Sequence, residues 1–215
     1  LVGADGPTHA GSFDTTYLST LPNFVVMAAS DEAELVRMIN TSTEINDRPC
    51  AFRYPRGTGL GSILPPINEK IEIGKSKIIK EGKKLAILNF GARLNETLKA
   101  AENLSKKGVP ITIVDARFAK PLDENLIWQL ATTHEAIMTI EEGSIGGFGS
   151  HVVDFLTKKG LMDSNLKFRS LTLPDIFIDQ DTPDKMYKLA NLDSVSIEEK
   201  VLDLLNSNII LKKQN

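Results

Sequence analysis

Cysteine is almost absent from this sequence, and so are long apolar runs. Its 215 residues include one cysteine, Cys50, which excludes an internal disulfide bond. No stretch approaches the roughly 20 apolar residues that a membrane-spanning helix needs. No charged segment followed by an apolar one opens the chain as an export signal would. These absences predict a soluble protein without a membrane partner, in a reducing, cytoplasmic compartment.

An excess of charge of one sign is also missing. The chain has 25 Lys plus Arg against 28 Asp plus Glu, which gives a formal net charge of −3. Such a balance creates no overall field that would gather nucleic acid, so no nucleic-acid partner is expected. Hydrophobic residues make up 41% and charged residues 25%, as in ordinary globular proteins. The length favours two small α/β domains.

The first residues predict that the chain begins inside a domain. The chain starts with Leu1 rather than methionine, and residues 1–4 have the pattern of a strand end that runs into a loop. On this basis the sequence is interpreted as a fragment of a longer protein.

Residues 1–62 have the pattern of a small α/β unit. Apolar runs predict strands at 24–27 and 50–54, and Ser30-Asp31-Glu32 supplies the N-cap and first-turn acids of a helix between them. The following stretch, 57–66, is rich in glycine and proline and has no apolar period. We place the domain boundary there, between residues 62 and 63.

Residues 63–215 show strands alternating with helices. This order implies a mostly parallel sheet covered by helices on both faces. The terminal residues 212–215 are expected to fray. Strands are predicted at 85–90, 111–114, 136–140 and 168–173, and helices at 94–107, 123–131, 149–159 and 196–205.

The loop from Gly3 to Gly11 combines an acid, a hydroxyl and an imidazole with three glycines and a proline. His9 has an unperturbed pKa near neutrality, and Asp5 lies four residues earlier, so the two form a candidate proton-transfer pair. The alternative is a structural loop in which Asp5 bonds the backbone and His9 caps a helix that begins near Phe13. Spacing alone does not separate these interpretations.

The string Arg53-Tyr54-Pro55-Arg56-Gly57 ends a predicted strand in a rigid turn. Open α/β sheets bind ligands beyond the carboxyl ends of their strands, where an arginine can hold a phosphate through two parallel hydrogen bonds. The alternative is that Arg53 or Arg56 pairs with a surface carboxylate, which is the commoner outcome for an isolated arginine.

Taken in order, these strings resemble the transketolase superfamily. Pro22 to Asp31 is similar to the strand and helix start of its pyrimidine-binding domain, and Val114 to Asp123 and Glu141-Glu142-Gly143 are similar to its C-terminal domain. The resemblance implies a partial pyrimidine-binding α/β domain over 1–62 and a transketolase C-terminal-like α/β domain over 63–215. Within the superfamily, the strings around His9 and Arg56 resemble the 1-deoxy-D-xylulose-5-phosphate synthases.

The resemblance implies a chemistry and a role for three residues. In that family, thiamine diphosphate with Mg²⁺ supplies the electron sink for joining pyruvate to glyceraldehyde 3-phosphate with loss of carbon dioxide, for isoprenoid and thiamine precursors. His9 matches the catalytic histidine beside the cofactor, Asp5 would hold a substrate hydroxyl, and Arg56 matches the arginine that grips the phosphate. The family forms homodimers. No metal ligand is expected in this chain.

The superfamily's segment for diphosphate and magnesium, a Gly-Asp-Gly followed by Asn, is absent from this sequence, and so is the upstream glutamate that activates the cofactor. We therefore expect both cofactors to be bound mainly by segments absent from this chain, which by itself should be inactive. Alternatives are a transketolase, a pyruvate dehydrogenase β-type subunit, or a non-catalytic docking half of a split enzyme.

For two weaker signals, a structural role is favoured over a functional one. Glycines over 143–149 follow a predicted strand and open a helix, but their spacing is not Gly-x-Gly-x-x-Gly, so turn chemistry is favoured over an anion site. His134 and His151 have no second ligand at metal-binding spacing.

Overall fold

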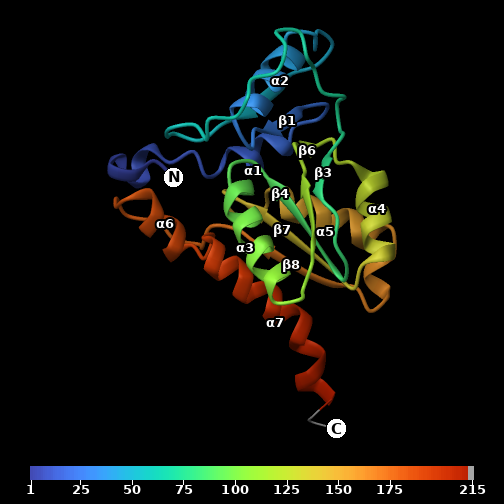
Figure 1. Cartoon of the computed structure of the whole chain (residues 1–215). Helices are drawn as coiled ribbons and strands as arrows, with labels where there is room; N and C mark the ends of the chain where they lie inside the picture. Colours follow the sequence, from blue (N-terminus) through green and yellow to red (C-terminus); the bar gives the residue numbers. More distant parts are fainter. Residues whose placement is uncertain (213–215) are drawn as a thin grey trace.

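The chain forms two β-sheets flanked by helices. A computed structural model describes residues 1–212, with side chains described to residue 206. The smaller sheet has the strand order β2-β1-β6, and the larger one has the order β3-β5-β4-β7-β8. The part built from residues 1–60 lies at one end of the larger sheet, and the C-terminal helix lies at the other end (Figure 1). The predicted fraying concerns mainly residues 213–215, which lie outside the described residues.

The first part contains the elements expected from its sequence. The predicted strands are confirmed to within one residue as β1 and β2, which pair in parallel. The side chain of Asp31 accepts a hydrogen bond of 2.8 Å from the backbone N–H of Glu34, as expected for an N-cap. The elements are two 3-10 turns, η1 (Gly3–Asp5) and η2 (Pro7–His9), then α1 (Asp14–Ser19), β1 (Val25–Ala28), α2 (Glu32–Ser42) and β2 (Cys50–Arg53).

The second part confirms the predicted α/β architecture with a mostly parallel sheet. Strands β5, β4, β7 and β8 run parallel to one another, and β3 joins the edge antiparallel. No described helix combines the length and apolar character needed to cross a membrane. The elements are β3 (Lys77–Lys80), β4 (Leu85–Phe90), α3 (Leu94–Lys106), β5 (Thr112–Asp115), β6 (Phe118–Lys120), α4 (Glu124–Thr133), β7 (Ala136–Glu141), α5 (Phe148–Lys158), η3 (Leu161–Asp163), β8 (Lys167–Leu171), α6 (Pro183–Leu189) and α7 (Ser194–Lys212).

Strands β3 and β6 and helix α6 were not predicted. Strand β6 has three residues and pairs antiparallel with β1 of the first sheet, so a segment from the second part completes the sheet of the first. A strand this short leaves no alternating pattern in the sequence to detect. Residues 54–76 connect β2 to β3 without a helix or strand. The boundary at 62/63 stays a prediction.

The two sheets share one apolar core. Alternate residues of β4 point to opposite faces: Leu85 and Ile87 pack with α3 and α7, and Ala86 and Leu88 pack on the other side. That second cluster also contains Val26 and Ala28 of β1, so burial joins the two parts.

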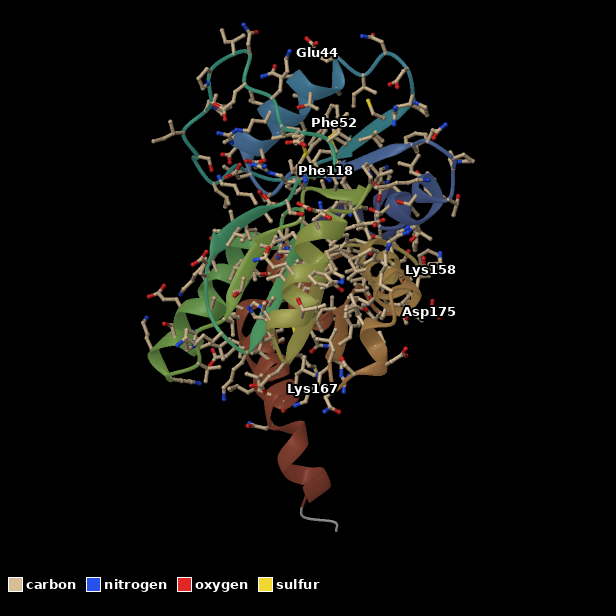
Figure 2. The ribbon with its side chains drawn as sticks, turned by 90° about the vertical axis from the view of Figure 1, so that its right-hand side faces the viewer. Glu44, Phe52, Phe118, Lys158, Lys167 and Asp175 are labelled. Atoms are coloured by element: carbon tan, nitrogen blue, oxygen red, sulfur yellow. The ribbon has the colours of Figure 1, made fainter. Side chains whose placement is uncertain are left out.

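A smaller cluster fills the first part under α2. Its fully buried Phe118 comes from β6, and Phe52 from β2 packs against the same cluster. Both aromatic side chains are labelled in the upper part of the molecule, near the first sheet (Figure 2). The unpredicted strand β6 therefore contributes core as well as sheet edge.

A buried carboxyl group lies at the junction between the sheets. Asp115, at the end of β5, is 1% exposed; it accepts a hydrogen bond of 2.6 Å from the hydroxyl of Ser30 and one of 3.1 Å from the backbone N–H of Arg117. Burial raises the pKa of Asp115 to about 7, and the nearby Glu34 carboxylate acts in the same direction, against the hydrogen bond from Ser30. This group binds its proton more tightly in the folded state than in the unfolded state.

We predict that Asp115→Asn becomes more stable relative to the unsubstituted chain as the pH rises from 5 to 8. A carboxyl whose folded-state pKa is raised from 3.8 to about 7 contributes stability below pH 3.8 that is lost as the pH rises through about 7. Asparagine cannot ionise, so the free energy of unfolding of the variant, minus that of the unsubstituted chain, should increase by roughly 1–3 kcal/mol from pH 5 to pH 8. Urea unfolding at both pH values measures it, and a pH-independent difference would contradict the assignment.

Candidate functional site

A cavity of about 270 Å³ lies where the carboxyl ends of strands from both sheets meet. Ala28 ends β1, Arg53 ends β2 and Phe90 ends β4, and Glu142 directly follows β7; all four line the cavity. Ligands of open α/β sheets bind at this kind of position, beyond the carboxyl ends of parallel strands. We therefore take this cavity and its rim as the candidate site.

Glycine residues let the backbone close around the cavity. Gly3 and Gly6 have φ angles of +63° and +64°, a left-handed conformation that favours glycine, and they shape the two short turns η1 and η2. Gly91, which follows β4, has φ +82°, and a Cβ added there would lie 3.0 Å from the Cβ of Ala28. A side chain at position 91 would therefore press the two sheets apart.

Arg53 joins three segments of the chain. Its guanidinium group lies 3.2 Å from the carboxylate of Asp14, donates a 3.2 Å hydrogen bond to the carbonyl oxygen of Gly11, and donates to the carbonyl oxygen of Glu142. The side chain is 20% exposed. The predicted alternative of a carboxylate pair is confirmed for Arg53, and three of its five N–H donors are used within the protein.

Arg56 and Asp5 are brought together by the structure. The guanidinium group of Arg56 forms an ion pair with the carboxylate of Asp5 and donates a 3.1 Å hydrogen bond to the carbonyl oxygen of Val2. The two side chains of the pair are 58% and 42% exposed. An exposed pair contributes only about 0–1 kcal/mol, so an anionic ligand can displace Asp5 at little cost. The pair lies at the rim of the cavity, which Arg56 lines.

His9 lies on the same loop as Asp5 but is turned toward solvent. Its Nδ1 atom is 3.0 Å from the hydroxyl of Thr8, and the ring does not line the 270 Å³ cavity. Within residues 1–206, His9 makes no contact with Arg56. The predicted alternative that His9 caps α1 is wrong, because that helix has no side-chain cap. Asp5 likewise bonds Arg56 rather than the backbone. The role of His9 in the site stays a prediction.

Glu142 is a site residue for which the sequence analysis predicted no role. Its carboxylate accepts a 2.9 Å hydrogen bond from the hydroxyl of Tyr187 and contacts the amino group of Leu1, the first residue of the given sequence. Burial, and then the nearby Glu142 carboxylate, raises the pKa of Tyr187, which keeps the hydroxyl protonated as a donor. The string Glu141-Glu142-Gly143 was visible in the sequence, but these partners lie more than 40 positions away.

The carboxylate of Glu141, just before the glycine-rich loop over 143–149, closes this loop. The side chain of Glu141 accepts hydrogen bonds of 2.9 Å and 2.8 Å from the backbone N–H groups of Phe148 and Gly149, at the start of α5. A Cβ at Gly147 would collide with this carboxylate. Turn chemistry is thus confirmed over an anion site, because the donors are already used. Burial raises the pKa of Glu141, and the two backbone donors oppose that shift.

We predict that Glu141→Ala lowers the free energy of unfolding by roughly 2–4 kcal/mol, because it leaves two buried N–H groups without an acceptor. Glu141→Gln keeps one acceptor oxygen and should cost less. Glu135→Ala, an exposed position just before the same strand, is the matched control and should change stability by less than about 0.5 kcal/mol. Urea unfolding provides the measurement, and equal midpoints for Glu141→Ala and Glu135→Ala would contradict the capping role.

The described residues fit only one end of the cofactor that the sequence implies. Ala28, Ala29, Phe52 and Phe90 give the cavity an apolar wall suited to a flat ring. Through residue 206, no group of three His, Cys, Asp or Glu side chains is arranged to hold a metal ion. His134, at the end of α4, bonds the hydroxyl of Thr112 at 2.8 Å. The described residues therefore provide no cluster of side chains for the metal ion.

Comparison with known proteins agrees with this arrangement. Residues 1–59 match the family described as "Transketolase, pyrimidine binding domain", and residues 74–197 match "Transketolase, C-terminal domain". A solved structure described as "Split gene transketolase, inactive beta4 tetramer" is similar, with a TM-score of 0.81 and 26% sequence identity. The match covers 95% of this chain and 65% of that one.

Proposed function

This chain belongs to the transketolase family, and we propose that it is the C-terminal part of a 1-deoxy-D-xylulose-5-phosphate synthase. Such an enzyme joins pyruvate to glyceraldehyde 3-phosphate, releases carbon dioxide and feeds isoprenoid and thiamine precursor synthesis. The observation that carries the proposal is the contact between Arg56 and Asp5 at the rim of the cavity between the two sheets.

The charges of this pair match a phosphorylated hydroxyaldehyde. The guanidinium of Arg56 offers parallel N–H donors that suit a phosphate, and it stays charged at every physiological pH. When the phosphate displaces Asp5 from Arg56, the Asp5 carboxylate remains beside the phosphate and can accept a hydrogen bond from a substrate hydroxyl. Glyceraldehyde 3-phosphate carries both groups on adjacent carbons, so one residue of the pair is matched to each.

His9 is proposed to move a proton or stabilise charge on the reacting part of the substrate. An exposed imidazole on a short, glycine-bounded loop is free to reach a ligand and can donate or accept a proton. Thiamine diphosphate, when bound, supplies the electron sink for the reaction. Its ring would lie against the apolar wall that Ala28 and Phe90 provide, and its diphosphate with Mg²⁺ would be held by segments outside this chain.

Other members of the family remain as alternatives. A transketolase or a pyruvate dehydrogenase β-type subunit shares the domains, but the Gly-Ser-Phe-Asp string after His9 and the Arg-Tyr-Pro-Arg-Gly turn favour the synthase. A non-catalytic docking subunit is the second candidate function, since the similar split-gene transketolase is an inactive tetramer. We propose that the complete synthase works as a homodimer.

The complete open reading frame that encodes this chain, expressed and purified, should release carbon dioxide from pyruvate only when glyceraldehyde 3-phosphate, thiamine diphosphate and Mg²⁺ are present. The 215-residue chain alone should show no turnover, because its sequence has neither the family's Gly-Asp-Gly segment nor its activating glutamate. Product analysis by mass spectrometry distinguishes a deoxyxylulose phosphate from a transketolase product. Turnover by the isolated chain, or no synthase product from the complete protein, would contradict the proposal.

In that complete enzyme, Arg56→Ala should raise the KM for glyceraldehyde 3-phosphate by roughly 10–100-fold, as expected when a charged hydrogen bond is lost. The KM for pyruvate should stay nearly constant. Arg48→Ala is the matched control, because Arg48 is an exposed arginine that also pairs with an aspartate, Asp47. Steady-state kinetics with each substrate varied measures both constants. An unchanged aldehyde KM in the Arg56 variant would remove the phosphate assignment.

A further inference from the structure

Three side chains of the second part form a chain of contacts that ends at the cavity. The guanidinium carbon of Arg93 lies 3.4 Å from the centre of the Tyr187 ring, a cation–π geometry. The Tyr187 hydroxyl donates its 2.9 Å hydrogen bond to the Glu142 carboxylate. Arg93 precedes α3, Tyr187 lies in α6 and Glu142 follows β7, so three separate elements fix one carboxylate.

Glu142 in turn contacts the segment that presents Arg56. Its carbonyl oxygen accepts a hydrogen bond from Arg53, which ends β2 three residues before Arg56. The bond from Tyr187 to the carboxylate holds residue 142 in place, so this residue is connected to the turn of Arg56 through Arg53.

Burial makes this arrangement specific. Glu142 is 7% exposed and Tyr187 also 7%. A carboxylate removed from water to this extent costs free energy unless donors and cations surround it. Tyr187 supplies a donor, and Arg53 and Arg93 supply positive charge close enough to act on Tyr187. The carboxylate has therefore one well-defined position, and so have the segments bound to it.

Resting on the proposed function, we propose that Glu142, held by Tyr187 and Arg93, is a positioning residue for the aldehyde substrate. It fixes the turn that carries Arg56 in the arrangement that receives the phosphate. By this contact the C-terminal domain takes part in substrate recognition, although the described residues include no group of side chains that could hold a metal ion.

The test uses the complete enzyme with Glu142→Gln and Tyr187→Phe. Each variant removes one charge or one hydroxyl with almost no change of shape. Each should raise the KM for glyceraldehyde 3-phosphate by about tenfold, as expected for one lost charged hydrogen bond, and leave kcat and the pyruvate KM within about twofold. Glu198→Gln is the matched control, because Glu198 is 8% exposed and bonds Asn103 and Lys107 away from the cavity.

A binding measurement separates this inference from the proposed reaction. Inorganic phosphate, titrated into each variant by calorimetry, should bind more weakly to Glu142→Gln and Tyr187→Phe than to Glu198→Gln or the unsubstituted enzyme. If synthase product is absent but this order of affinities holds, the reaction is wrong and the positioning role stands. If both variants keep the phosphate affinity and aldehyde KM of the control, or lose kcat and both KM values equally, the positioning role is wrong.

Discussion

The guanidinium group of Arg53 is the interaction on which the candidate site depends. Its three acceptors come from the end of the N-terminal loop at Gly11, from the first helix at Asp14, and from Glu142 of the second part. Glu142 is far in the sequence from Gly11 and Asp14, and all three residues line the cavity. Three of its five N–H donors are used in this way, so Arg53 mainly connects parts of the protein. Arg56, three residues later and held only by an exposed carboxylate and a carbonyl, remains available.

This division between a structural and an available arginine follows from their surroundings. Arg53 lies at the end of β2, where both sheets meet, and it has three partners within the protein. Arg56 follows Pro55 in an exposed turn, so a phosphate can compete with Asp5. The shared apolar core beneath them, which includes Ala28 of β1 and Phe90 of β4, keeps the strand ends in place. The site therefore combines a rigid base with a polar rim that a ligand can rearrange.

Strands and helices with a clear period were predictable, and contacts between distant segments were not. The strand predicted at 85–90 and the N-cap predicted at Asp31 were correct, because apolar runs and capping are local signals. Strand β6 was missed because it has three residues and is stabilised by β1 of the other sheet. Glu142 received no role because its partners are Leu1 and Tyr187. Asp5 and Arg56 were both chosen from their motifs, but their direct ion pair depends on how the chain folds.

The central claim is that the rim between the two sheets binds the phosphate of an aldehyde substrate through Arg56. A crystal structure of the complete enzyme with glyceraldehyde 3-phosphate tests it most directly. The account predicts that the phosphate oxygens lie within hydrogen-bonding distance of the Arg56 guanidinium, with its ion pair to Asp5 opened and the ring of His9 turned toward the ligand. A phosphate bound elsewhere, with the pair between Asp5 and Arg56 intact, would contradict it.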